Sequence, residues 1–210
     1  MISKVLQPFN KVLSDNGIEK KGIIQIGAFD GEEVSSYLEM GFDPIMLVEA
    51  NPDNIPKLHK SVDHHEANIR IYPVAITNYD GMANFNIPER ADCGSIYNYT
   101  GLKTVFGIQT LRTVEVPCFT VDTLMKEYNE DPALYNVLNM DIEGGELDAL
   151  KGATELLKHI NVIYSEIRFA DLFENGTMCE DLEEFVFKLG FKKVFYKKWH
   201  ETFGDAIYIR

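Results

Sequence analysis

The sequence contains little cysteine, no long apolar run and no metal-binding pattern of histidines such as H-E-x-x-H. Its three cysteines, Cys93, Cys118 and Cys179, are odd in number and widely spaced, so they indicate neither a disulfide framework nor a C-x-x-C zinc site. No segment approaches the roughly 18 to 20 apolar residues of a membrane span, and the N-terminus lacks the apolar core of a signal peptide. We therefore expect a soluble, cytoplasmic protein with reduced thiols and no membrane partner.

Basic residues are also scarce. The chain of 210 residues has 20 Lys and Arg against 33 Asp and Glu, which gives a formal net charge of -13. This excess of acids repels a polyanion unless a local basic patch overcomes it. Lysines at positions 192, 193, 197 and 198 make the C-terminal end basic, and we interpret them as solvated or edge-protecting residues. We therefore expect a small-molecule partner rather than nucleic acid, and the sequence predicts no particular oligomeric state.

Short apolar runs alternate with segments of helical periodicity. This alternation predicts an α/β fold with a doubly wound, mostly parallel sheet, and the length favours one domain over residues 1–210. Residues 1–20 contain an amphipathic helix that begins or kinks near Pro8. The last two strands form an antiparallel edge. The predicted strands are residues 23–26, 44–48, 69–74, 82–87, 113–120, 135–142, 161–166, 191–196 and 206–209, and the predicted helices after residue 20 are 32–40, 51–59, 121–128, 146–159 and 178–189.

Residues 88–112 lack clear periodicity. They include a stretch rich in glycine and tyrosine at 93–101. A segment of this length without regular structure is often a lid or a substrate loop, and its aromatic content argues against the alternative of a disordered insertion. We predict that it contacts the substrate.

The most informative stretch is Tyr135–Lys151. It begins as a buried strand, and then two carboxylates, Asp141 and Glu143, precede a Gly-Gly turn and a helix that starts at Glu146. Open α/β sheets bind ligands at the carboxyl edge of their strands, which is where this pattern places both acids. The stretch therefore predicts chemistry rather than packing alone.

A second strand, turn and helix surrounds Gly27 and Gly31. Glycine in such a turn lets a ligand approach the backbone, and it tolerates a positive φ. A dinucleotide fingerprint requires G-x-G-x-x-G, and the third glycine is missing, which weakens the prediction of an NAD-type oxidoreductase without excluding it. Glu49 ends the next strand 22 residues after Gly27, close to the interval of about 20 at which nucleotide sites place a carboxylate on ribose hydroxyls.

Three predicted strands end in an acid, at Glu49, Asp141 and Glu166. Because the carboxyl ends of parallel strands meet at one edge of the sheet, we expect the three to lie on the same side. Ala75 and Ile76 follow another strand at this edge, where an adenine ring could lie.

These segments resemble one protein family. Residues 24–31, the Val48–Pro52 segment and above all the Asp-x-Glu-Gly-x-Glu block at 141–146 look like the FkbM-type family of S-adenosylmethionine-dependent methyltransferases, over residues 20 to 168. The resemblance implies a class I (Rossmann-like) methyltransferase fold that acts by O-methylation on hydroxyls of sugars or small natural products. By the same resemblance, the residues that bind the cofactor would be Gly27, Ala28, Asp30, Gly31, Glu49, Ala50, Asn51, Ala75 and Asp141. The chain departs from the family pattern at Gln25, where such sites often have an acid, so Asp30 or Asp141 would bind the ammonium group of the cofactor instead.

The candidate catalytic residues are Asp141, Glu143 and Glu166. One of them could remove the proton of an acceptor hydroxyl, or the three together could hold a hard cation such as Mg²⁺ that acidifies it. Glu143 has an alternative role, in which it braces the Gly144-Gly145 turn by accepting backbone hydrogen bonds. A non-catalytic cofactor-binding module with the same fold is a third reading of the whole chain.

Overall fold

The computed structural model describes residues 2–210 and contains a seven-stranded sheet in the order β3-β2-β1-β7-β8-β10-β9. The first five strands in this order pair in parallel, and β10 runs antiparallel to β8 and β9. The prediction of a mostly parallel sheet with an antiparallel edge is therefore confirmed. The strands are β1 (Gly22–Ile26), β2 (Ile45–Val48), β3 (Ile69–Tyr72), β7 (Tyr135–Met140), β8 (Val162–Arg168), β9 (Lys192–Lys198) and β10 (Phe203–Ile209).

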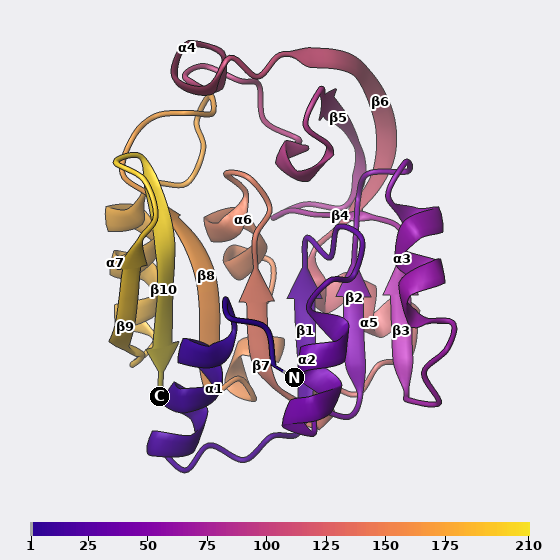
Figure 1. Ribbon diagram of the computed structural model, residues 1–210, viewed down its shortest axis with the longest axis vertical. Coiled ribbons are helices and arrows are strands. Elements are labelled where there is room, and N and C mark those ends of the chain that lie inside the picture. The colour runs from indigo at the N-terminus through magenta and orange to yellow at the C-terminus, as the bar shows by residue number, and fades with distance from the viewer. Residues whose placement is uncertain (1) are drawn as a thin grey trace.

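Helices cover both faces of this sheet, as Figure 1 shows. One apolar cluster joins three helices to one face, and it includes Phe9, Tyr37 and Leu58. A second cluster joins three others to the opposite face, and it includes Leu124, Leu150 and Leu182. The first group consists of α1 (Gln7–Asp15), α2 (Val34–Met40) and α3 (Ile55–Val62), and the second of α5 (Val121–Glu127), α6 (Glu146–Lys151) and α7 (Cys179–Lys188).

A second, three-stranded sheet lies above the carboxyl ends of the parallel strands (Figure 1). Its strands are β4 (Ala75–Ile76), β5 (Gly81–Pro88) and β6 (Thr110–Phe119), in the order β4-β6-β5. The strands predicted at 82–87 and 113–120 are confirmed as β5 and most of β6, but the sequence predicted neither β4 nor the separation of these strands into a second sheet. The first residues of β6 are exposed on both faces, so they carry no alternating apolar pattern. The segment 88–112 is consequently shorter than predicted, and it holds the short helix α4 (Leu102–Phe106) and a 3₁₀ turn at Ala91–Cys93.

Two predicted helices were placed wrongly. The helix expected at 51–59 begins at Ile55, because Asn51 accepts a hydrogen bond from the Asp53 backbone N–H and so forms a turn before the helix. The helix expected to continue to residue 159 ends at Lys151 and is followed by a separate 3₁₀ turn at Leu156–Lys158. The carboxylate of Asp122 accepts the backbone N–H groups of Glu155 and Leu156, and these bonds start the new turn. The N-terminal helix begins at Gln7 with Pro8 in its first turn, one of the two alternatives predicted.

Strand β9 forms one edge of the large sheet, and it carries the four lysines that we interpreted as solvated or edge-protecting residues. Lysine on an edge strand discourages pairing with other strands. The cysteines at 93, 118 and 179 are free and buried. Among residues 2–210, no helix has both the length and the apolar character needed to cross a membrane.

Candidate functional site

A cavity of about 370 Å³ opens at the carboxyl edge of the parallel strands, beneath the smaller sheet. Most residues predicted for the site line it, and they come from β4, from β8 and from the loops that follow β1, β2 and β7. The predicted residues that line the cavity are Gly27, Glu49, Ala50, Asn51, Ala75, Asp141, Glu143 and Glu166. Ala28, Asp30 and Gly31 were predicted to bind the cofactor but lie outside the lining.

The first glycine turn brings the backbone of β1 against that of β7. Gly27 has a φ of 85°, and a Cβ built on it would lie 1.8 Å from the backbone oxygen of Asp141. Gly31 has a different role, because a Cβ there would lie 2.3 Å from Ser61 Oγ on α3. Gly27 therefore shapes the cavity wall, whereas Gly31 allows α3 to pack closely.

Glu49 is held in place by two backbone N–H groups. Phe29 donates to Oε2 and Asn51 donates to Oε1, both at 2.7 Å. The side chain is 6% exposed, and burial raises the pKa of Glu49 to about 6, although the two backbone hydrogen bonds limit the rise. Because each carboxylate oxygen can accept a second hydrogen bond, the group remains able to bind a ribose diol.

The wall next to Glu49 is apolar. Ala75 and Phe85 pack in a cluster on which Ala50 and Ile96 also lie. All four line the cavity together with Ile76. A flat apolar ring such as adenine fits this surface.

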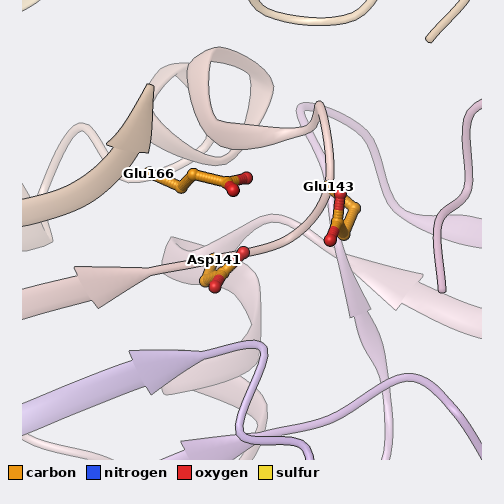
Figure 2. A group of neighbouring side chains, drawn as sticks. All are labelled: Asp141, Glu143 and Glu166. Atoms are coloured by element: carbon orange, nitrogen blue, oxygen red, sulfur yellow. The ribbon is translucent and has the colours of Figure 1, made fainter. Parts of the chain in front are cut away.

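The three candidate acids converge at the ends of β7 and β8, and Figure 2 shows their carboxylates turned toward a common space. One oxygen from each lies within 4.8 Å of the others. Asp141 follows β7, whereas Glu166 lies within β8 and not at its end. Glu143 sits in the loop with a φ of 57°, a conformation that costs an L-residue about 1 kcal/mol or more. Strain of this kind is common at ligand sites.

Arg168 is the main residue that sequence reasoning missed. Its Nη2 donates to Glu143 Oε2 at 2.8 Å and to Glu166 Oε2, and its guanidinium lies over the ring of Phe173. The Arg168 side chain is only 4% exposed, and those of Glu143 and Glu166 are 13% and 10% exposed. Its position two residues after Glu166 on β8 was the available signal, since residues two apart on a strand share a face. A buried guanidinium therefore supplies positive charge to two of the three acids.

Hydrogen bonding, and not the pKa, separates Asp141 from its two neighbours. The residue is exposed to the open cavity, yet the protein around it and the Glu143 charge raise the pKa of Asp141 well above its ordinary value. Burial likewise raises the pKa of Glu143 and of Glu166, and the positive charge of Arg168 opposes the rise in all three acids. Burial by itself would lower the pKa of Arg168, yet the two carboxylates raise it above its ordinary value. The Asp141 carboxylate opens into the cavity and accepts no hydrogen bond from residues 2–210.

Glu146, rather than Glu143, braces the glycine turn. Its Oε1 accepts hydrogen bonds from the backbone N–H groups of Ile142 and Gly144, at 3.2 and 3.3 Å. Glu146 itself is buried. The alternative role predicted for Glu143 is therefore wrong, because the Glu143 carboxylate is directed to Arg168 instead.

Polar residues on the sheet itself complete the wall. Asn139 precedes Asp141 by two on β7, and Tyr164 precedes Glu166 by two on β8, so each shares a face with a predicted acid. The Tyr164 hydroxyl donates to Asp205 Oδ2 at 2.9 Å, and Asp205 lies opposite Glu166 in the register of β8 and β10. None of the three was predicted, although the period of 2 along each strand could have found Asn139 and Tyr164.

The segment 88–112 covers the cavity and is fastened to its rim. Ser95 Oγ donates to the backbone oxygen of Glu143 at 2.7 Å, and Tyr97 OH donates to Asp148 Oδ2 at 2.7 Å. At the far end of the segment, the ring of Phe106 contacts those of His200 and Phe203 on the β9–β10 hairpin, with centroid distances of 4.9 and 6.2 Å. The segment thus has the position of a lid, and its contact with substrate remains a prediction.

A profile of the Methyltransferase FkbM domain matches residues 25–193. The chain belongs to the FkbM methyltransferase family. Methyltransferase FkbM from Methylobacillus flagellatus KT superimposes with a TM-score of 0.63 at 15% identity, over 97% of this chain and 48% of that one. The present FkbM-family chain therefore spans about half the length of that relative. No curated protein matches the chain.

Other solved structures share the fold at still lower identity. The magnesium protoporphyrin IX methyltransferase from Synechocystis PCC 6803, with S-adenosylmethionine bound, has a TM-score of 0.55 at 7% identity, over 99% of this chain and 78% of that one. A putative tRNA methyltransferase from Streptococcus pneumoniae has a TM-score of 0.54 at 13% identity, over 100% and 70%. These similarities show that the FkbM-family chain has the class I methyltransferase fold.

The residues of the cavity fit S-adenosylmethionine, the cofactor of this fold. Three residues that line the cavity have a buried polar atom without a hydrogen-bond partner among residues 2–210, namely Gln25 Oε1, Asn51 Nδ2 and Arg168 Nε. Glu49 can bind the ribose diol, and the apolar wall can bind the adenine. The excess of carboxylates favours the positively charged groups of the cofactor. The residues fit Mg²⁺ less well, because Arg168 already binds an oxygen of Glu143 and of Glu166.

Proposed function

We propose that the protein transfers a methyl group from S-adenosylmethionine to an oxygen atom, the hydroxyl of a sugar or small natural product. When bound, the cofactor supplies an electrophilic methyl group on a positively charged sulfur. The observation that carries the proposal is the Asp141 carboxylate, which opens into the cavity and accepts no hydrogen bond from residues 2–210, whereas Arg168 holds Glu143 and Glu166. Removal of a hydroxyl proton requires a base of this kind, whereas an amine acceptor could react without one.

The cofactor would occupy the side of the cavity formed by β1, β2 and β4. Glu49 would accept the two ribose hydroxyls, and Ala75 with Phe85 would pack against the adenine. The backbone at Gly27 would lie beside the amino-acid part. This placement is supported by Gln25 Oε1 and Asn51 Nδ2, which come from β1 and from the loop after β2 on this side and have no hydrogen-bond partner within residues 2–210.

Asp141 would act as the base, and Arg168 would fix the other two acids. A positioned base contributes about 10² to 10⁴-fold to the rate. Arg168 holds Glu143 and Glu166 through its guanidinium, so their carboxylates are less free to take a proton. They would instead orient the acceptor hydroxyl toward Asp141. Alignment of donor and acceptor in the cavity can lower the barrier by a further 7 to 11 kcal/mol or so in well-oriented systems.

Isothermal titration calorimetry with S-adenosylmethionine, S-adenosylhomocysteine and NAD tests the donor. We expect the first two to bind and NAD to give no heat; binding of NAD alone would restore the oxidoreductase reading. Methyl transfer is then screened with sugars, hydroxylated natural products and total RNA as acceptors. RNA belongs in the panel because RNA methyltransferases share the fold. Methylation of RNA but of no small hydroxyl compound contradicts the proposal, and cofactor binding without any transfer favours a non-catalytic module.

A further inference from the structure

Gln25 on β1 pairs with a carboxylate from the start of α2. Gln25 Nε2 donates to Glu33 Oε2 at 3.1 Å, and both side chains line the cavity. Because a carboxylate only accepts, the amide nitrogen must face Glu33, and the amide oxygen must therefore point elsewhere. That oxygen, Gln25 Oε1, is buried and has no hydrogen-bond partner among residues 2–210. The Gln25 side chain is 4% exposed, so an unsatisfied acceptor here costs free energy unless a ligand donates to it.

The surroundings of this pair favour a cationic donor. Asn139 lies opposite Gln25 in the register of β1 and β7 and also lines the cavity, and its Nδ2 donates to Tyr37 OH at 2.7 Å. The amide nitrogen of Asn139 is thus engaged, which leaves its carbonyl oxygen for a ligand. Burial raises the pKa of Glu33, although the hydrogen bond from Gln25 opposes the rise. A carboxylate in such a place gains most from a positively charged partner.

The other acids suggested by the sequence fit this role less well. Asp30 lies outside the cavity lining. Asp141 opens toward Glu143 and Glu166, at the side where the acceptor would bind. Glu33 reaches the position beside Gln25 from another element, because α2 begins next to the end of β1.

We infer that Gln25 and Glu33 together bind the α-ammonium group of the amino-acid part of the cofactor. An ammonium group donates three hydrogen bonds, and the Glu33 carboxylate, Gln25 Oε1 and Asn139 supply three acceptors. The acid expected on β1 is thus replaced by a glutamine that holds an acid from α2. The inference rests on the proposed use of S-adenosylmethionine.

The test compares two ligands by calorimetry. S-Adenosylhomocysteine carries the ammonium group, and 5′-methylthioadenosine has the same adenosine and sulfur but no amino acid. Glu33→Gln should weaken binding of S-adenosylhomocysteine about 10- to 100-fold, the effect of losing a charged hydrogen bond, and leave that of 5′-methylthioadenosine unchanged. The matched control is Glu127→Gln, which removes the same charge from an exposed position outside the cavity lining and should change both affinities less than about threefold.

A double variant tests the inference even if the single variant Glu33→Gln folds poorly. Gln25→Glu with Glu33→Gln exchanges the amide and the carboxylate, and it should restore most of the affinity for S-adenosylhomocysteine. Unchanged affinity in Glu33→Gln, equal weakening of both ligands, or a double variant as weak as the single one overturns the inference. If the unaltered protein binds neither ligand, the proposed function fails instead.

Discussion

Gly27 and Asp141 meet backbone to backbone at the bottom of the cavity, since the Asp141 N–H donates to the neighbouring Ile26 carbonyl and the Asp141 carbonyl faces Gly27. Gly27→Ala would place a methyl group 1.8 Å from that carbonyl oxygen and would add the strain of a positive φ. We expect a loss of about 3 kcal/mol or more in the free energy of unfolding, together with loss of cofactor binding. Urea denaturation and calorimetry measure the two effects.

Gly41→Ala is the control for the strain alone. Gly41 has a φ of 94° but nothing within 4 Å of an added Cβ. This variant should lose only about 1 kcal/mol and should bind the cofactor normally. Equal losses in the two variants would show that the contact with Asp141 is unimportant.

Arg168→Met tests the buried ion pairs. Removal of one partner from a buried pair leaves uncompensated charge on Glu143 and Glu166, and we expect a loss of about 3 to 5 kcal/mol at neutral pH. The folded-state pKa values of both acids would rise further, so the folded variant would bind protons more tightly than the unfolded chain. Its stability deficit should therefore shrink as the pH falls from 8 to 5.

The control for Arg168 is an exposed ion pair of the same type. Arg112 donates to Asp53 at 2.6 Å, and the two side chains are 49% and 52% exposed. Arg112→Met should cost less than about 1 kcal/mol, with no comparable pH dependence. If Arg168→Met loses equally little free energy of unfolding, or if its loss does not change with pH, our description of the ion pairs of Arg168 with Glu143 and Glu166 is wrong.

Binding of S-adenosylhomocysteine should depend on the ionisation of Glu49. The ribose hydroxyls donate best to the charged carboxylate, whose pKa burial raises to about 6. Affinity should therefore be fully developed above about pH 7 and should decline as the pH falls through 6. Calorimetry at pH 5 to 8 measures this decline. Glu49→Gln should bind S-adenosylhomocysteine weakly, and its affinity should change less with pH. If both proteins follow the same profile, the titrating group is another acid.

Asp141→Asn should lower kcat about 10² to 10⁴-fold on any hydroxyl acceptor, because the amide cannot take the proton. The affinity for S-adenosylhomocysteine should change by less than about tenfold, the effect of one hydrogen bond. Asp63→Asn, at the C-terminal end of α3 and outside the cavity lining, provides the control and should retain full activity. An Asp141→Asn enzyme with undiminished kcat excludes Asp141 as the base.

Phe106→Ala should loosen the lid where it meets the hairpin. The variant removes the ring contacts with His200 and Phe203, so we expect KM for the acceptor to rise while the affinity for S-adenosylhomocysteine stays constant. The adjacent Val105→Ala changes a side chain that is 45% exposed, and it should leave both quantities unaltered. Equal effects of Phe106→Ala on acceptor and cofactor would contradict a role confined to the lid.

The sequence predicted the centre of the large sheet well because β1, β2, β7 and β8 are buried on both faces. Such strands form continuous apolar runs, as at β1 and β7, and their acidic ends mark the edge of the sheet. In the smaller sheet the sequence predicted β5 and most of β6 but missed β4. It also missed the first residues of β6, which are exposed on both faces and leave no periodic pattern.

At the site, residues after a strand were easier to predict than residues brought in from elsewhere. Asp141 and Glu49 follow their strands directly, so the chain order alone placed them at the cavity. Asp205 enters through the pairing of β10 with β8, and Glu33 enters from the start of α2. Such neighbours depend on register and on helix position, which local periodicity does not specify. Asp30 illustrates the converse, since it is next to Phe29 in sequence, and Phe29 lines the cavity whereas Asp30 does not.

The antiparallel direction of β10 has a consequence for how this protein could diversify. Its first residues, not its last, reach the cavity, so the turn at residues 199–202 stands beside the segment 88–112 at the mouth. Both pieces can lengthen, shorten or change sequence without shifting the parallel strands that carry Gly27 and Glu49. Changes in these two segments would therefore alter which molecule enters the cavity, while the proposed cofactor side at Gly27 and Glu49 would keep its structure.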